Sequence, residues 1–173
     1  MPQLRQSMGH VNLALPGDGE LLKAAGRVAL AHGQLELMLR MTIKSLSGLT
    51  VREALDATQR SKNWELREEI LRLFKSKTAD PTLRLKLKAL LGRCEQVSDD
   101  RNRLLHNAWA LAADGSVVMK GDKHAWGPAA TVSDLDMLAE DIASIVNELN
   151  QVRLSGFIRS VCTQKKGKLT TED

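Results

Sequence analysis

The feature that most constrains the fold is a run of apolar residues at alternating four- and three-residue spacing in the middle of the chain. The run follows Asp80 and Pro81, which favour a helix start because the carboxylate caps free N–H groups and proline lacks the N–H that would be unsatisfied there. Such spacing places side chains on one face of an α-helix. The pattern therefore predicts a helix over about 80–108. Its expected inward positions are Leu83, Leu87, Leu90, Cys94, Val97, Arg101, Leu104 and Ala108.

Four further segments show helical spacing of their apolar residues. The first, about 20–47, ends at Gly48, and Thr50 with Glu53 forms a capping-box pattern that opens a short helix to about 58. A third helix is expected over about 63–77, and a last one, opened by Ser133 and Asp136, over about 133–161. The expected inward residues are Leu22, Ala25, Ala29, His32, Leu35, Leu39, Ile43 and Leu46 in the first helix, and Trp64, Leu66, Ile70, Leu73 and Phe74 in the third.

The helical pattern stops at Trp109, and the next segment predicts two short strands, 109–112 and 117–119, joined by a turn over 113–116. The following segment, with Gly121, Gly127 and Pro128, is expected to be a loop. The sequence thus predicts an all-α, single-domain, up-and-down bundle of about five helices, with a small β-hairpin between the last two. Residues 18–162 would form this domain, after a flexible lead of residues 1–17 and before a disordered polar tail of residues 163–173.

Composition limits the partners and the kinds of site. A net charge of +4 and a pI of about 9.2 fit a partner that carries phosphates, such as RNA. Cys94 and Cys162 lie far apart without zinc-ligand spacing, which fits a reducing compartment, and neither a metal nor a cofactor is expected. The chain lacks phosphate-loop, dinucleotide-binding, zinc-protease and serine-hydrolase motifs. With no apolar stretch of membrane-spanning length, we expect a cytoplasmic protein without membrane contact.

One inward position of the predicted helix over 80–108 is polar. Arg101 stands where the pattern requires an apolar side chain, and burying an unpaired guanidinium is costly, so this residue needs a partner or a function. The surrounding segment reads Asp99-Asp100-Arg101-Asn102-Arg103-Leu104-Leu105-His106-Asn107-Ala108-Trp109. The same Arg-to-His spacing occurs at Arg5 with His10 and at Arg27 with His32. Arg101 alone combines a following Asn, a late position in a helix and a break in an apolar stripe.

This segment resembles the motif of the HEPN family. HEPN domains are helical bundles in which an Arg is followed, after four to six residues, by a His, often with a polar residue such as Asn directly after the Arg. Arg101, Asn102 and His106 match that pattern. The resemblance extends in helical order over roughly residues 20–160.

The resemblance implies a metal-independent endoribonuclease, acting as a toxin or in defence or stress. In this reaction a 2′-hydroxyl attacks the adjacent phosphate and leaves a cyclic phosphate and a free 5′-hydroxyl. His106 would then move protons, Arg101 would stabilise the anionic transition state as a planar multi-donor cation, and Asn102 would orient the His or the phosphate.

The resemblance also implies partners. HEPN nucleases generally act as dimers that bring two motifs into one cleft, so we expect a homodimer through the helix that bears Arg101 and His106. A toxin of this kind would in addition have an antitoxin or other protein partner. Arg103, Asn107 and Trp109 are the expected substrate-binding residues, the Trp by stacking on RNA bases.

Other interpretations of the same residues stay open. Arg101 could pair with an inward acid such as Glu36, while His106 caps the helix end. The protein would then be a catalytically inactive HEPN-like module for dimerisation and protein interaction. Trp109 could likewise be a packing residue, and His32 is expected to be a core histidine whose hydrogen-bonding groups have partners. A DNA-binding regulator is the weakest alternative, because no segment offers a convincing recognition helix.

Overall fold

The computed structural model of the chain describes residues 12–13, 17–121 and 125–164. Within these residues the chain forms six helices and one three-stranded antiparallel sheet, so the prediction of a broadly all-α protein is confirmed. In chain order the elements are α1 (Gly19–Ser47), α2 (Val51–Thr58), α3 (Asn63–Lys75), α4 (Pro81–His106), β1 (Trp109–Leu111), β2 (Val117–Lys120), β3 (Trp126–Pro128), α5 (Val132–Leu154) and α6 (Phe157–Gln164).

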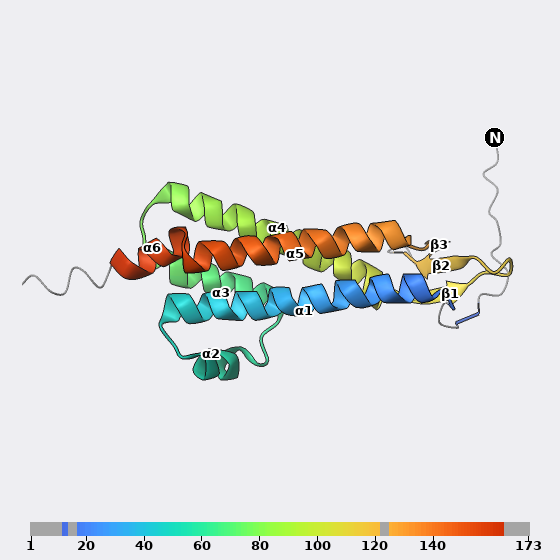
Figure 1. The fold of residues 1–173 in the computed structure, drawn as a ribbon, viewed down its shortest axis with the longest axis horizontal. Helices are drawn as coiled ribbons and strands as arrows, with labels where there is room; N and C mark the ends of the chain where they lie inside the picture. The colour runs from blue at the N-terminus through green and yellow to red at the C-terminus, as the bar shows by residue number, and fades with distance from the viewer. Residues whose placement is uncertain (1–11, 14–16, 122–124, 165–173) are drawn as a thin grey trace, which may run out of the picture.

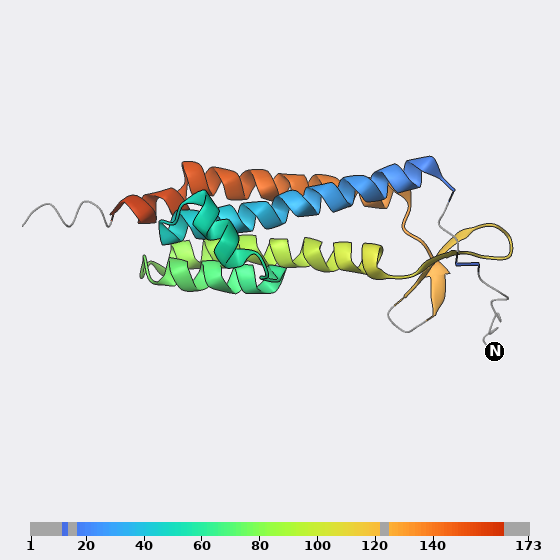
Figure 2. The same cartoon turned by 90° about the horizontal axis from the view of Figure 1, so that it is seen from below.

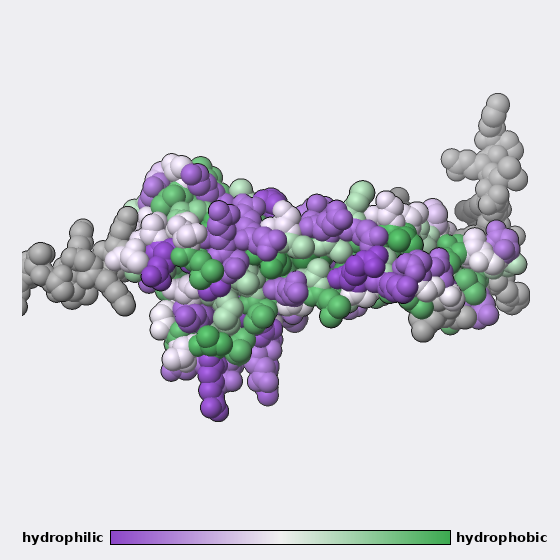
Figure 3. Space-filling view, in the orientation of Figure 1, coloured by the Kyte–Doolittle hydropathy of each residue, from purple (hydrophilic) through white to green (hydrophobic). Residues whose placement is uncertain are grey.

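The helices form two layers. α1 and α5 lie side by side along most of their length (Figure 1), and α3 and α4 pack beneath them as the second layer (Figure 2). The short α2 lies on the outside of α1, and α6 extends beyond α5 at one end of the bundle. The sheet lies at the opposite end, where α4 stops and α5 begins. Hydrophilic and hydrophobic side chains alternate over the face formed by α1 and α5 (Figure 3).

The helix starts follow the capping patterns of the sequence. The Asp80 carboxylate accepts hydrogen bonds from the backbone N–H groups of Thr82 (2.8 Å) and Leu83 (3.3 Å), with Pro81 as the first residue of α4. The capping box of Thr50 and Glu53 is also present at the start of α2. These caps satisfy N–H groups that have no partner inside the helix. Both predicted helix starts are confirmed.

The inward face of α1 differs from the prediction in its first half. α1 buries Leu21, Ala24, Val28, His32, Leu35, Leu39, Thr42, Ile43 and Leu46. The expected positions are correct from His32 onward, but Leu22 and Ala29 are exposed. The first half of α1 is rich in Ala and Gly, so the side chains on its neighbouring faces are of similar size. The predicted apolar stripe is therefore one residue late in this half. Trp64, also expected inward, is 50% exposed because Leu66, Ile70 and Phe74 form the buried face of α3.

The predicted last helix over 133–161 is wrong in two respects. It begins at Val132, with a capping box of Thr131 and Asp134 in place of the expected Ser133 and Asp136. It also breaks after Leu154 into α5 and α6. At the break, a Cβ on Gly156 would lie 2.8 Å from Cα of Val152, so the tight turn requires glycine. The Ser155-Gly156 pair was the available signal for this break.

The predicted hairpin is confirmed and is part of a larger sheet. β1 and β2 pair antiparallel, with Trp109 opposite Met119, and Gly115 adopts a positive φ of 82° in the turn between them. The expected loop contains β3, which pairs antiparallel with β2. Asn12, from the predicted flexible lead, forms a bridge to Leu111 with two backbone hydrogen bonds of 2.9 Å. The sheet therefore joins the end of α4 to the start of α5.

The remaining boundaries are less fully described. α6 reaches Gln164, two residues beyond the predicted end of the domain at residue 162, and the other residues of the predicted tail lie outside the described part of the chain. The domain boundaries therefore stay predictions. Among the helices that the structure describes, none has the length and apolar character needed to cross a membrane.

The burial of α1 gives a direct test of the fold. We expect Leu35→Ala to lower the free energy of unfolding by about 2–5 kcal/mol, because it removes buried methyl groups and leaves a cavity. Leu30→Ala, on the same helix at a side chain that is 74% exposed, should change it by no more than about 0.5 kcal/mol. Urea denaturation followed by circular dichroism measures both values. Equal losses for the two variants would contradict the observed orientation of α1.

Candidate functional site

The candidate site lies on the last two turns of α4. This helix ends at His106, and Asn107 follows in an extended conformation (φ −75°, ψ 149°). Val97 and Leu104 are buried and fix one side of these turns to the core. Arg101 lies between them along the helix and is half-buried, whereas His106 is exposed. The core thus holds the arginine while the histidine faces outward.

Arg101 is the centre of a small polar cluster. Its Nη1 donates a hydrogen bond to Oδ1 of Asn102 at 3.0 Å and lies 2.9 Å from Nε2 of His106. A guanidinium carries only N–H donors, so Nε2 of His106 is the acceptor in this geometry and carries no proton. The structure therefore brings the three predicted catalytic residues into contact, with the lone pair of the imidazole directed at the arginine.

Arg101 has no acidic partner among the residues that the structure describes. No carboxylate oxygen in this part of the chain lies within 4.0 Å of its guanidinium, and its buried Nε has no hydrogen-bond partner. Glu36, the partner considered in the sequence analysis, instead lies 3.8 Å from Nδ1 of His32. The alternative of an ion pair between Arg101 and Glu36 is therefore not formed. A buried N–H donor without an acceptor is rare in folded proteins.

His32 of α1 is buried against α4, as expected for a core histidine. Its Nε2 lies 3.3 Å from Oγ of Ser98, and that hydroxyl donates its single proton to the carbonyl of Cys94 at 2.7 Å. Oγ can then only accept, so the proton of the neutral ring is on Nε2. Nδ1, which faces Glu36, is left unprotonated.

The charges around His32 oppose its protonation. Burial is the main cause that lowers the pKa of His32, and the positive charge of Arg101 lowers it further. Glu36 acts in the opposite direction and raises this pKa, while His106 lowers it. His32 is therefore electrostatically linked to both members of the Arg101–His106 pair, although it lies on a different helix.

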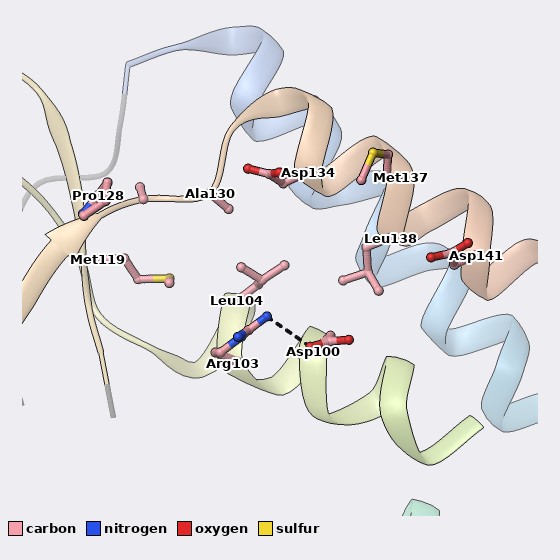
Figure 4. A pocket seen from close by; sticks show the side chains of 11 residues that line it. Asp100, Arg103, Leu104, Met119, Pro128, Ala130, Asp134, Met137, Leu138 and Asp141 are labelled. Carbon is pink, nitrogen blue, oxygen red and sulfur yellow. Dashed lines mark hydrogen bonds and ion pairs between the residues drawn. The ribbon is translucent and has the colours of Figure 1, made fainter. Parts of the chain in front are cut away.

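Arg103 lies on another side of α4 from Arg101. Residues two apart in a helix diverge by about 200°. Its Nη2 bonds Oδ1 of Asp100 at 3.0 Å, and both residues line a pocket between α4, α5 and the sheet (Figure 4). Leu104 and Leu138 also line this pocket, but Arg101 and His106 do not. The structure therefore separates Arg103 from the residues with which it was predicted to act.

Trp109 and Asn107, the other two residues predicted to bind the substrate, both have side-chain groups turned toward the protein itself. The indole N–H of Trp109 donates to the carbonyl of Leu104 at 2.7 Å, one of the last carbonyls of α4, and the half-buried ring packs against the core. The side-chain nitrogen of Asn107 is buried without a hydrogen-bond partner. Trp109 thus has the packing role considered in the sequence analysis, and its stacking on RNA stays a prediction.

One contact of the site was not predicted from the sequence, whereas the burial of Cys94 was. The contact between His32 and Ser98 was missed, although both are polar residues in the apolar stripes of neighbouring helices. Cys94, one turn before Ser98, is buried, and desolvation raises the pKa of its thiol to about 12, so it is not a reactive nucleophile. Among the described residues, no group of three or more His, Cys, Asp or Glu side chains is placed to hold a metal ion.

The link between His32 and Arg101 can be measured without any substrate. We expect Arg101→Met to raise the pKa of His32 toward its ordinary value, because the variant removes a positive charge that disfavours the imidazolium. The measurement is an NMR titration of the histidine ring signals. Arg103→Met removes the same charge on another side of α4 and should leave the titration of His32 unchanged. An identical shift in both variants would contradict a specific link with Arg101.

Comparison of the chain with known protein families, with curated protein sequences and with solved structures finds no match in any of the three.

Proposed function

We propose that the protein is a metal-independent endoribonuclease of HEPN type that cleaves RNA by attack of a 2′-hydroxyl on the adjacent phosphate. Arg101 and His106 would carry the reaction, with Asn102 as the residue that orients the guanidinium. The bundle of α1, α3, α4 and α5 would then be a HEPN-like bundle. A cytoplasmic toxin or an enzyme of defence or stress would fit this activity.

One observation carries the proposal: the Arg101 guanidinium donates to His106 but has no carboxylate in the described chain to neutralise it. An arginine with a purely structural role would be expected to have its charge paired and its donors satisfied. Arg101 instead keeps a buried Nε–H without an acceptor. A phosphate at the exposed Nη side of the guanidinium would supply the missing negative charge, because phosphates accept N–H···O bonds from arginine.

The geometry fits the chemistry of this reaction. Nε2 of the exposed His106 accepts from Arg101 in the free protein. It could take the proton of the attacking 2′-hydroxyl once a bound phosphate engages the guanidinium and releases this lone pair. A bond forms between that oxygen and phosphorus, and the bond from phosphorus to the 5′-oxygen breaks. The leaving 5′-oxygen takes up a proton, and the products are a cyclic phosphate and a 5′-hydroxyl. Arg101 would stabilise the extra negative charge on the phosphorus oxygens during this exchange.

A specific observation also favours the second candidate, an inactive HEPN-like module for dimerisation and protein interaction. Arg103 is paired with Asp100, and the indole N–H of Trp109 is bonded to Leu104, so two of the predicted RNA contacts have partners inside the chain. In that case Arg101 and His106 would be a polar pair at an interface with a second chain or an antitoxin-like protein. The two functions differ in whether RNA is cut.

RNA cleavage in excess EDTA tests the proposal. We expect wild-type protein to cut labelled total RNA and tRNA and to leave cyclic-phosphate ends, because the reaction uses side chains alone. Arg101→Ala and His106→Ala should each lower the rate by about 100-fold or more, the scale for loss of one transition-state donor or one acid–base group. Arg103→Ala is the matched control, since it removes an arginine of the same helix outside the cluster.

The result can also exclude the nuclease. If folded wild-type protein leaves every RNA intact while Arg101→Ala lowers the melting temperature, the cluster is structural and the protein-interaction function stands. If Arg103→Ala is as inactive as Arg101→Ala, the assignment of the roles is wrong.

The proposal includes a homodimer formed through the last turns of α4. We expect purified protein to have about twice the 19.1 kDa mass of one chain by light scattering. Asn102→Lys should dissociate the dimer, because a two-fold axis near this exposed residue would bring the two added charges together. Thr82→Lys adds the same charge at the other end of α4 and should leave the dimer intact. A monomeric wild type would rule out this interface.

A further inference from the structure

His32 is a titratable side chain near the site that the proposed reaction does not use. It belongs to α1, is 5% exposed and lies against α4, where its Nε2 is 3.3 Å from Oγ of Ser98, three residues before Arg101. Side chains three apart are neighbours on a helix, and Arg101 and His106 both lower the pKa of His32. Buried histidines of this kind usually serve packing alone. The contacts of the His32 ring with Ser98 and Glu36 determine which nitrogen carries each proton. They therefore determine when His32 becomes a second positive charge near Arg101.

The second proton of His32 has one possible position. Nε2–H is directed at Ser98 Oγ, whose own proton is given to the Cys94 carbonyl. A proton taken up by the ring must therefore bind Nδ1, on the side of Glu36. Glu36 is 3.8 Å away and its side chain is 40% exposed, so water screens part of the attraction that would stabilise the imidazolium.

We propose that His32 is a positioning residue for Arg101, and that its ring has to stay uncharged for the guanidinium to hold its place against His106. This inference rests on the proposed function of the same site. A charged His32 would place a second cation beside Arg101 in a partly buried setting, where repulsion is stronger than in water. Arg101 is not held by a carboxylate in the described chain, so its hydrogen bonds to Asn102 and His106 are what the repulsion would break.

The pH profile of RNA cleavage tests the inference. On the acid side, wild-type kcat/KM should fall with a slope of one where a single protonation abolishes activity, and with a slope approaching two below the pH at which His32 also takes a proton. His32→Gln keeps a donor for Ser98 but cannot be charged, so its slope should stay at one. One pH unit below the second break, wild type should have lost about tenfold more activity than the variant. Equal slopes would overturn the inference and leave the nuclease standing.

A second variant separates charge from packing. Glu36 raises the pKa of His32, so Glu36→Gln should move the second break of the profile to lower pH. Damaged packing alone would not move a break in that direction. Glu20→Gln, an exposed carboxylate in the first turn of the same helix, is the matched control and should leave the break in place. A break that does not move in Glu36→Gln would count against the inference.

A readout without substrate keeps the two proposals distinct. The buried Nε–H of Arg101 can be followed by NMR, and its signal should shift in wild type as His32 takes up its proton. The corresponding shift should be absent in His32→Gln. If wild type cuts no RNA, the proposed nuclease fails, and this signal still decides the inference about His32. An Arg101 Nε–H signal that does not shift as His32 takes up its proton would overturn the inference.

Discussion

The packing of α1 against α5 is the interaction on which the other elements depend. The two longest contacting faces of the bundle belong to these helices, and each is lined along its length by buried aliphatic side chains. Aromatic residues make up only 3% of the chain, so few large side chains are available to anchor the core. Stability then comes from many small contacts between close-packed side chains, which a long pair of helices provides. α3 and α4 pack onto this pair as a second layer.

The end of α4 is fixed from two directions, and this sets the position of the candidate site. Val97 and Leu104 attach the last turns to the core, and the indole of Trp109 caps the Leu104 carbonyl from the first residue of β1. The sheet in turn connects to α5 through β3. Arg101 and His106 therefore lie on a helix end that cannot move freely relative to α1. A fixed helix end is suited to chemistry that needs side chains held in one arrangement.

The helices were predictable from the sequence because their signals are local. Caps such as Asp80 with Pro81, and apolar stripes such as that of α4, depend on residues a few positions apart. The orientation of the first half of α1 was not predictable, since Ala and Gly give faces of similar size. The pairing of Arg101 with His106 was expected from the Arg-to-His motif, which is local in the sequence. The contact of His32 with Ser98 instead joins two helices and depends on how they pack. β3 was missed because its strand contains Gly127 and Pro128.

Three other arginines in the described part of the chain join helices through carboxylates, unlike Arg101. Each of three ion pairs links two helices at 2.5 to 2.9 Å: Arg27 with Asp136, Arg67 with Glu95, and Arg93 with Glu148. Arg67, which joins α3 to α4, is the least exposed of these three arginines. In each of these three pairs a carboxylate balances the arginine. Arg40 and Arg153 have no such partner in the described chain and donate instead to the Thr58 carbonyl and to Oδ1 of Asn150. At the α1–α4 contact the nearby acid, Glu36, faces His32, and Arg101 faces a neutral imidazole. Positive charge without an internal counter-charge is costly in a folded protein. An anion bound from outside the chain would remove that cost, which is the physical basis of the phosphate binding that we propose.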